Sequence, residues 1–163
     1  IGLEFDRDGE IARRGAICRP LLDELNGMEF YHQSGPKSLG REWVETQVYP
    51  MLERYGLSVE DKLRTFYEHA AFQIFRIINA NPSSAGNGKL LITGGGAFNK
   101  FLVERIEALC PCQIVIPGRQ IIEYKEALIF AFLGALYMAD EPGCLASVTG
   151  ASMDNIGGML FKV

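Results

Sequence analysis

The chain has 163 residues, of which 48% are apolar and 22% are charged. This composition predicts one soluble, folded domain of ordinary size and excludes an intrinsically disordered chain. The net charge of −4, without a cluster of Lys and Arg, argues against a protein that binds a nucleic-acid backbone. The sequence starts at Ile1 without an initiator methionine or a leader pattern, so we expect a piece of a longer protein.

Short helices separated by turns are predicted for the beginning of the chain. Residues 6–9 read as a turn or a helix cap, and residues 10–14 read as a short helix that Gly15 ends. A second short helix is expected over residues 19–25, because its leucines are spaced for one helical face. Gly35 then marks a loop before the next element.

The next helix is expected to begin at Ser38 and to extend to Leu52. Pro50 lies inside this pattern. Because proline lacks the backbone N–H and its ring clashes with the preceding turn, we expect the helix to kink or split there. Aromatic residues of this helix and the following one are expected to form a face that packs against another lobe or a second subunit: Trp43, Phe66, Tyr67 and Phe75.

Alternating helices and strands are predicted for the rest of the chain. Ser58, with an acid three residues later, resembles a capping box and starts a long helix that ends near Asn79. There follow a polar loop over 81–88, a strand over 90–92, a helix over 99–109, a strand over 113–117 and a helix that contains Glu126. This order predicts a short, mainly parallel sheet covered by helices, within a single domain over residues 1–163.

The longest apolar run covers residues 127–139. It is shorter than the ~18 residues that a membrane-spanning helix needs, so we expect no membrane partner and a helix that is buried nearly all round. A terminal strand is expected over residues 156–163. The four cysteines are scattered along the chain, which is typical of reduced thiols in a cytoplasmic protein.

Residues 89–100 carry the strongest local signal in the sequence. A short apolar strand leads directly into Gly94, Gly95 and Gly96, and Asn99 then opens the next helix. Without a Cβ atom the backbone can adopt a positive φ and approach a ligand closely, and a helix N-terminus favours an anion. This pattern is typical of a phosphate or nucleotide site, with a tight turn that binds no ligand as an equal alternative. It matches neither the Walker A nor the G-x-G-x-x-G pattern.

Three charged residues are candidates for further ligand contacts. Ligands of open α/β sheets bind beyond the carboxyl ends of the strands, where Glu126, near the start of the last long helix, can lie. Its carboxylate suits a sugar hydroxyl or a hydrated Mg²⁺, but from residue type alone a favourable contact with the helix N-terminus is the stronger interpretation. Lys37 and Arg41 suit a phosphate or a sugar acid, with a solvated helix start as the alternative.

Neither a catalytic triad nor a metal centre is predicted for this chain. Cys110 and Cys112 are too close together for a zinc knuckle pair, and the two histidines, His32 and His69, lie far from them in the sequence. His69 falls in the long helix and is expected to be an ordinary packed residue. We therefore assign no metal ligand and no catalytic triad from these residues, and the resemblance described below implies that the catalytic base lies outside this chain.

Four motifs follow one another along the chain: Pro36-Lys-Ser-Leu-Gly-Arg-Glu42, Thr93-Gly-Gly-Gly-Ala-Phe-Asn99, Lys125-Glu-Ala-Leu-Ile-Phe-Ala131 and Ser147-Val-Thr-Gly-Ala151. Together they resemble, in order and at comparable spacing, the C-terminal half of the anhydro-N-acetylmuramic acid kinases. The start of the chain, residues 2–9, resembles the Tyr-Asp-x-Asp-Gly stretch of that family. The similarity covers nearly the whole chain, and four ordered motifs make it much more specific than any one of them.

The resemblance implies an α/β fold of the actin-like, hexokinase-like (ribonuclease H-like) class, in which two lobes close on ATP. Members of this family use ATP, Mg²⁺ and water to open the 1,6-anhydro ring of anhydro-N-acetylmuramic acid and to phosphorylate O6. The product is N-acetylmuramic acid 6-phosphate, in the recycling of peptidoglycan. The chain would be the C-terminal lobe, with the N-terminal lobe of the same enzyme as its partner and a homodimer left open.

The same resemblance implies roles for individual residues. Gly94, Gly95 and Gly96 would contact the adenosine and the phosphates, and Asn99 would support their turn. Glu126 matches a glutamate that lies near the sugar in the family. This match strengthens the functional interpretation of Glu126 over a contact with the helix N-terminus.

The sequence also departs from the family pattern. The first phosphate loop and the aspartate that activates water are not in this chain, while Phe98 and Leu39 stand where many members have His and Thr. Phosphoryl transfer needs positioning and charge stabilisation from both sides, so we expect no kinase activity from this chain alone. Two alternatives stay open: a lobe of another amino-sugar kinase or ATPase of this fold, and a non-catalytic binding or assembly module.

Overall fold

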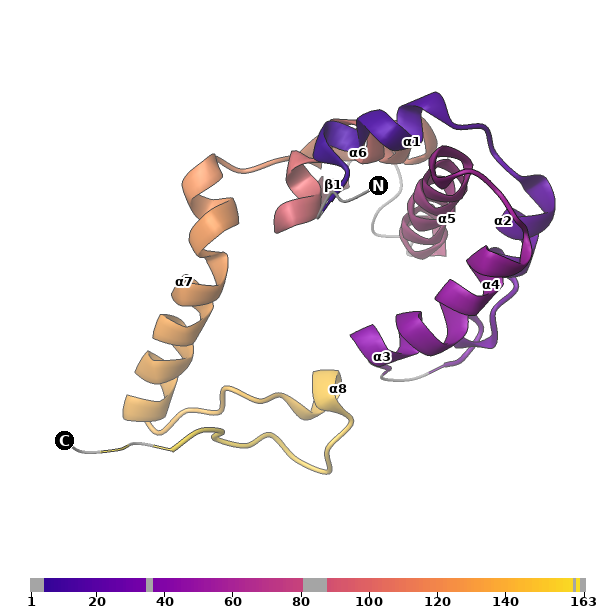
Figure 1. Ribbon diagram of the computed structural model, residues 1–163. Coiled ribbons are helices and arrows are strands. Elements are labelled where there is room, and N and C mark those ends of the chain that lie inside the picture. The colour runs from indigo at the N-terminus through magenta and orange to yellow at the C-terminus, as the bar shows by residue number, and fades with distance from the viewer. Residues whose placement is uncertain (1–4, 35–36, 81–87, 160, 162–163) are drawn as a thin grey trace.

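The structure is a computed structural model that describes residues 5–34, 37–80, 88–159 and 161. Its α-helices are, in chain order, α1 (Glu10–Arg14), α2 (Arg19–Asn26), α3 (Arg41–Trp43), α4 (Tyr49–Arg54), α5 (Val59–Ala80), α6 (Lys100–Leu109), α7 (Arg119–Met138) and α8 (Ala146–Thr149). Shorter 3₁₀ turns are η1 (Arg7–Gly9), η2 (Glu29–Tyr31) and η5 (Gly95–Phe98), and the strands are β1 (Lys89–Leu91) and β2 (Gln113–Val115). Figure 1 shows these elements in an open arc, with α7 standing apart from the N-terminal helices.

The long helix α5 is the element around which the N-terminal part packs. Ser58 starts it as predicted, because the Ser58 Oγ accepts a hydrogen bond from the backbone N–H of Asp61 at 3.1 Å. The helix packs against α1, α2 and α6. The short helices predicted at the start of the chain are confirmed, since α1 ends at Gly15 and α2 ends at Gly27.

The apolar core of the described residues includes two clusters, and α5 contributes to both. The first is built on Leu21, Leu25 and Val48, and the second on Ala71, Ile106 and Cys110. Trp43 and Phe66 pack against the first cluster, and Phe75 packs against the second. These aromatic side chains are thus partly buried against the chain's own helices, and their packing against another lobe or a second subunit stays a prediction.

The helix predicted from Ser38 begins later and contains an irregular turn. Gly40 is the residue before α3, and a π-helical segment, η3 (Val44–Val48), joins α3 to α4. The predicted disturbance near Pro50 is confirmed, since Pro50 is the second residue of α4, directly after the π segment. Because proline offers no N–H to the preceding turn, the regular hydrogen-bond pattern is interrupted there.

The two strands form the predicted parallel sheet. Lys89 pairs with Gln113, Leu90 with Ile114 and Leu91 with Val115. The strands are connected through η5 and α6, so the predicted order of helix, strand, helix, strand, helix is confirmed from α5 onward. The parallel arrangement brings the ends of both strands to the same edge of the sheet.

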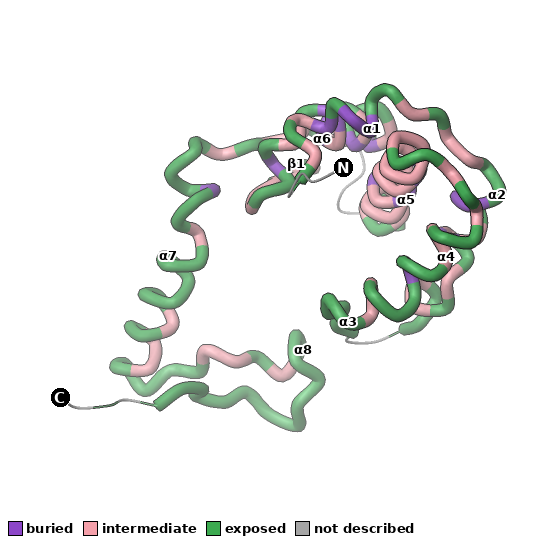
Figure 2. The backbone as a smooth tube through the Cα atoms, in the orientation of Figure 1, coloured by how far each residue is buried: buried purple, intermediate pink, exposed green. Residues whose placement is uncertain are grey.

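The prediction that the apolar helix is buried nearly all round is wrong for the described residues. α7 contacts η5, and Ile122 is its buried residue. The side chains of Phe130 and Phe132 are 72% and 61% exposed, and Figure 2 shows α7 mainly in the colour of exposed residues. A helix that is apolar on all sides is normally covered on all sides, so α7 presents a surface that other parts of a folded protein usually bury.

The described part of the chain after α7 is mostly exposed and irregular. Cys144 and Asn155 pair as an antiparallel bridge, and α8 lies between them in the sequence. Residues 156–159 form no strand, contrary to the terminal strand expected there, and 160, 162 and 163 lie outside the described residues. The expectations for residues 2–4, for the loop at Gly35 and for most of the 81–88 loop also lie outside them. Among the helices that the structure describes, none is long and apolar enough to cross a membrane.

Candidate functional site

The glycine turn connects β1 to α6 through one sharp change of direction. Gly94 has a φ of 76°, in the left-handed region that favours glycine. The backbone N–H of Ala97 then donates to the carbonyl of Gly94 at 3.0 Å, which closes η5. Asn99 caps α6 as predicted, because its Oδ1 accepts a hydrogen bond from the backbone N–H of Leu102 at 3.0 Å.

Gly95 and Gly96 have no comparable need to be glycine. Their φ angles are not in the left-handed region, and a Cβ atom added to either would meet nothing within 4 Å. The packing of the described residues therefore gives no reason for two consecutive positions without side chains. Close approach of a ligand to the backbone would explain both glycines. The first N–H groups of a helical turn have no partner within that turn, so they are available to such a ligand.

The Asp6–Gly9 turn packs directly on the glycine turn. Gly9 has a φ of 76°, and a Cβ atom there would lie 2.5 Å from Asn99 Oδ1 and 2.5 Å from Phe101 Cβ. Since real Cβ atoms do not approach other atoms so closely, glycine is required at this position. The start of the chain and the start of α6 thus fit together with no room for a side chain between them.

A hydrogen-bond network holds these two turns together. Asp6 caps α1 with both oxygens, which accept from the backbone N–H groups of Ile11 at 2.9 Å and Ala12 at 3.0 Å. The Tyr67 hydroxyl of α5 donates to Asp6 Oδ2 at 3.3 Å and accepts from Asn99 Nδ2 at 2.8 Å. Burial raises the pKa of Tyr67, so its hydroxyl stays protonated and remains a donor at neutral pH.

A pocket of about 470 Å³ opens between the two turns. Its walls combine backbone at the glycine turn, polar groups of the network described above, two aromatic rings and the charged side chains of η1. They are Phe5, Asp6, Arg7, Asp8, Tyr67, Gly95, Gly96, Phe98 and Asn99. Concave sites with apolar walls and a few placed polar groups are the usual form of a small-molecule site.

Cationic side chains lie on the α7 side of the glycine turn. The Lys125 Nζ donates to Thr93 Oγ1 at 3.0 Å, directly before Gly94. The guanidinium of Arg119, the first residue of α7, lies 5.8 Å from the centre of the Phe98 ring. Arg119 also pairs with Glu123 at 2.6 Å. Charges of both signs therefore lie on both sides of the turn, since on the pocket side Asp8 pairs with Lys100 at 3.4 Å.

Glu126 does not lie at the start of a helix. Because α7 begins at Arg119, Glu126 lies about two turns inside it, and a contact with the helix N-terminus is no longer an explanation, since that effect fades within the first turn. Glu126 is exposed, and no hydrogen bond or ion pair within the described residues involves its carboxylate. Its neighbour Lys125 makes the contact with the strand end instead.

Lys37 and Arg41 lie away from the glycine turn. Lys37 Nζ donates to the carbonyls of Phe30 at 2.8 Å and Gln33 at 3.1 Å, and it stacks on the Phe30 ring. Arg41, whose side chain is highly exposed, pairs with Glu45 one helical turn later. The structure thus gives Lys37 a role in holding a local turn, and a phosphate or sugar contact for either residue stays a prediction.

The sequence did not assign the pocket residues Asp6, Asp8 and Tyr67, or the neighbouring Lys125, to a binding site. The Asp-Arg-Asp-Gly pattern was interpreted as a turn, which is correct, but nothing local indicates which other turn it packs against. Lys125 precedes Glu126 in a motif already noted, and its helical position follows once the true start of α7 is known. Tyr67 carried no signal beyond its place on an amphipathic helix.

The histidine predicted to be an ordinary packed residue, His69, is indeed packed inside the protein. His69 is 2% exposed, and its ring nitrogens contact Asn26 Oδ1 at 2.7 Å and the Tyr31 hydroxyl at 2.9 Å. Burial lowers the pKa of His69 to about 4. The four cysteines are free thiols. Over the described ranges, no group of three or more His, Cys, Asp or Glu side chains could hold a metal ion.

One comparison with known proteins adds to this geometry. The profile of a protein family described as "AnmK: Anhydro-N-acetylmuramic acid kinase" matches the chain over residues 1–163. The match includes the Asp6–Gly9 turn, the glycine turn and α7. It therefore covers all the segments that build the pocket.

Proposed function

The chain belongs to the anhydro-N-acetylmuramic acid kinase family, and from this premise we propose that it is the C-terminal, nucleotide-binding lobe of such a kinase. The enzyme would use ATP and water to open the 1,6-anhydro ring and to phosphorylate O6, which gives N-acetylmuramic acid 6-phosphate. This step belongs to the recycling of peptidoglycan in the cytoplasm. The fold of the complete enzyme would be actin-like, with two lobes that close on the nucleotide.

The glycine turn is the observation that carries this proposal. Gly95 and Gly96 leave open space where side chains would otherwise stand, and the adjoining pocket is large enough for part of a nucleotide. Asn99 and Tyr67 hold the turn in place through hydrogen bonds at 3.0 and 2.8 Å. A rigid turn that exposes backbone N–H groups beside a pocket is suited to phosphate-bearing ligands.

ATP fits this arrangement, and when bound it supplies the phosphoryl group. Kinase Mg²⁺ is usually held by one or two carboxylates together with the phosphates of the nucleotide. Because the described residues offer no cluster of three metal-ligating side chains, we propose that Mg²⁺ arrives with the phosphates. This chain would bind and orient the nucleotide, and the group that activates water would come from the other lobe.

Glu126 is proposed to contact the sugar. It projects from the second turn of α7 and is exposed, one residue beyond the Lys125 that contacts the end of β1. A carboxylate that is not engaged by a neighbouring cation can accept hydrogen bonds from sugar hydroxyls. The sugar would then lie on the α7 side of the glycine turn.

The other lobe is proposed to cover α7. The exposed apolar residues of this helix include Leu128, Phe130 and Phe132, and a helix of this kind needs a partner on more than one side. The sheet supports the same proposal, because parallel sheets are normally covered on both faces, while Leu91 of β1 is 60% exposed. We propose that the N-terminal lobe of the same enzyme provides these missing contacts.

A coupled assay of ADP formation with the anhydro-sugar tests this assignment. The 163-residue chain alone is expected to give no turnover, and addition of the N-terminal lobe as a separate chain is expected to restore it. Turnover by the chain alone would contradict the assignment as one lobe. A mixture of both lobes that forms ADP with other amino sugars but not with the anhydro-sugar would instead identify a related kinase of different specificity.

A further inference from the structure

We propose that a second pocket, between the C-terminal half of α5 and the turn at η2, binds an amphiphilic carboxylate, which is one acid group on an apolar body. This Lys37–Arg76 pocket has a volume of about 520 Å³. The described residues that line it are all different from those that line the pocket beside the glycine turn. The inference therefore goes beyond the proposed kinase function and does not depend on it.

The walls of the Lys37–Arg76 pocket are mainly apolar. Ile74, Ile78 and Leu90 line it and also pack against the second core cluster, so this part of the wall is continuous with the core. Phe30 and Ile77 line it as well, and Ile77 is 72% exposed. Removal of such surface from water by the apolar part of a ligand is favourable.

Two cationic side chains, Lys37 and Arg76, line the same pocket. None of the ion pairs among the described residues includes either of them. The described residues of the pocket wall also include no Asp or Glu. The pocket therefore has a local excess of positive charge, which favours an anionic ligand.

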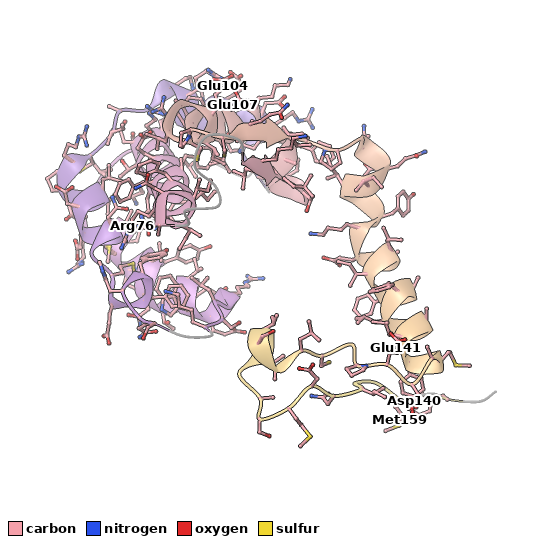
Figure 3. All side chains as sticks on the ribbon, turned by 180° about the vertical axis from the view of Figure 1, so that it is seen from behind. Arg76, Glu104, Glu107, Asp140, Glu141 and Met159 are labelled. Atoms are coloured by element: carbon pink, nitrogen blue, oxygen red, sulfur yellow. The ribbon has the colours of Figure 1, made fainter. Side chains whose placement is uncertain are left out.

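A chain of hydrogen bonds positions the guanidinium of Arg76, which lies in the C-terminal half of α5 (Figure 3). Its Nη1 donates to Gln73 Oε1 at 3.2 Å. Gln73 Nε2 in turn donates to Asn26 Oδ1 at 2.9 Å, and the same oxygen contacts the ring of the buried His69 at 2.7 Å. A guanidinium has five N–H donors, so Arg76 keeps donors for a carboxylate while one of them holds it in place.

The ammonium of Lys37 is held in a similar way. It donates to the carbonyl oxygens of Phe30 at 2.8 Å and Gln33 at 3.1 Å, and it lies 4.9 Å from the centre of the Phe30 ring. Both acceptors are neutral, so the positive charge is not cancelled. Since an ammonium has three donors, the contacts within the described residues leave Lys37 one N–H for a ligand.

The combination of these walls and these cations determines the class of ligand. A small hydrated anion would leave the apolar walls in contact with water, and an uncharged apolar molecule would leave both cations without an anionic partner. A carboxylate on an apolar body satisfies both parts of the wall, and charge-assisted hydrogen bonds to it are stronger than neutral ones. The volume is in the usual range for small-molecule pockets.

Octanoate is a suitable probe, with acetate and 1-octanol as the acid group and the apolar body alone. Isothermal titration calorimetry of the 163-residue chain at pH 7 is expected to show octanoate binding at least about tenfold more tightly than either. The position of the probe is reported by Trp43, the one tryptophan. Its ring lies 5.1 Å from that of Phe30, centre to centre, so its fluorescence is expected to change with octanoate.

Variants of the cation test the electrostatic part of the proposal. Arg76→Met is expected to weaken octanoate about tenfold and to leave 1-octanol within about twofold, which also shows that the pocket remains folded. Arg76→Lys keeps the charge and is expected to retain octanoate binding within about threefold. Arg14→Met is the control, because Arg14 is an exposed arginine of α1 outside the pocket, and it is expected to bind octanoate like the unchanged chain.

Variants of the apolar wall test the location of the site. Ile77→Ser is expected to weaken octanoate and 1-octanol by the same factor, about threefold or more, because both ligands lose the same apolar contact. Phe130→Ser is the matched control, since Phe130 of α7 is also 72% exposed and lies outside the pocket. It is expected to leave octanoate binding unchanged.

Four results would each overturn the inference. They are octanoate binding no tighter than 1-octanol, equal octanoate affinity of Arg76→Met and the unchanged chain, a loss in Phe130→Ser without one in Ile77→Ser, and a loss of octanoate binding when the N-terminal lobe is added. The third would place octanoate on α7, and the fourth would assign the pocket to a contact between lobes. Because the glycine turn lies outside this pocket, none of these results changes the expectation for ATP.

Discussion

Asn99 and Tyr67 lie 32 residues apart in the sequence, and the Asn99 amide donates a hydrogen bond to the Tyr67 hydroxyl at 2.8 Å. The other end of the same amide caps α6. One side chain therefore fixes the glycine turn to α5 and to the helix that follows it. Through Tyr67 and Asp6, the network also reaches the N-terminal turn that forms the opposite wall of the pocket.

Replacement of Asn99 tests how much this connection stabilises the fold. Asn99→Ala removes the cap and the bond to Tyr67, so the free energy of unfolding is expected to fall by about 1–2 kcal/mol. Asn99→Ser is the matched comparison, because its hydroxyl can cap α6 but is too short to reach Tyr67. We expect about half the loss for Asn99→Ser, measured by urea unfolding with the fluorescence of Trp43, the one tryptophan. Equal stability of all three proteins would exclude the network as a stabilising element.

Two glycines of the site are expected to respond in opposite ways to alanine. Gly9→Ala places a Cβ atom 2.5 Å from Asn99 Oδ1 and forces a positive φ on alanine, so the free energy of unfolding should fall by about 2 kcal/mol or more. Gly96→Ala enters open space at an ordinary φ and should change stability by less than about 0.5 kcal/mol. Thermal or urea unfolding of both variants checks this difference, and similar losses in the two would contradict the packing described for Gly9.

The burial of His69 predicts a dependence of stability on pH. Its pKa of about 4 in the folded chain lies below the value of about 6.5 for an unfolded histidine. Between these values the unfolded chain binds the proton and the folded chain does not, so stability is complete above pH 6.5 and is lost as the pH falls toward 4. The expected slope is at most about 1.4 kcal/mol per pH unit. It is measured by urea unfolding at a series of pH values.

The second histidine provides the control for this measurement. His32 is exposed, and His32→Gln should keep the pH dependence between 4 and 6.5. His69→Gln should reduce it, although the variant is less stable at neutral pH because Asn26 and Tyr31 lose their contacts with the ring. An unchanged slope in His69→Gln would assign the pH dependence to other groups.

The local elements of the fold could be predicted because their signals are local. Ser58 starts α5, Asn99 starts α6, and Gly15 ends α1, as their capping or turn chemistry indicates. The parallel pairing of β1 and β2 follows from the order of elements. The start of α7 could not be located because Arg119–Tyr124 carries neither a capping side chain nor a clear apolar period, and this error misplaced Glu126.

The surroundings of the glycine turn could be predicted only in part. The turn itself and the Asn99 cap are visible in the sequence, whereas the wall of Asp6 and Asp8 is brought there by packing between segments about ninety residues apart. The burial of α7 was predicted from its apolar sequence alone. An apolar helix is expected to be covered by other parts of the protein, but the described residues leave α7 exposed. This exposure supports the proposal of a second lobe.

The exposure of α7 allows a test of whether the proposed N-terminal lobe covers this helix. Figure 3 places Glu141 and Met159 together near the end of α7, beside an apolar pocket of about 620 Å³ that Phe130 also lines. Phe130→Ser is expected to weaken association with the separately expressed N-terminal lobe by at least about tenfold, because the loss of a buried phenylalanine costs several kcal/mol. Glu107→Ser, on the outer side of α6 (Figure 3), is the control. Equal association of both variants, measured by analytical ultracentrifugation, would contradict the proposal that this lobe covers α7.

The most direct test of the account is titration of the chain with ATP and Mg²⁺, with Gly95→Val beside the unchanged protein. Gly95 borders the pocket, and valine would fill the open space in front of the turn, so we expect ATP affinity to fall by at least about tenfold. Gly134→Val, in open space on α7, serves as the control and is expected to bind ATP like the unchanged chain. Unchanged ATP binding by Gly95→Val would contradict the central claim that the glycine turn binds the nucleotide.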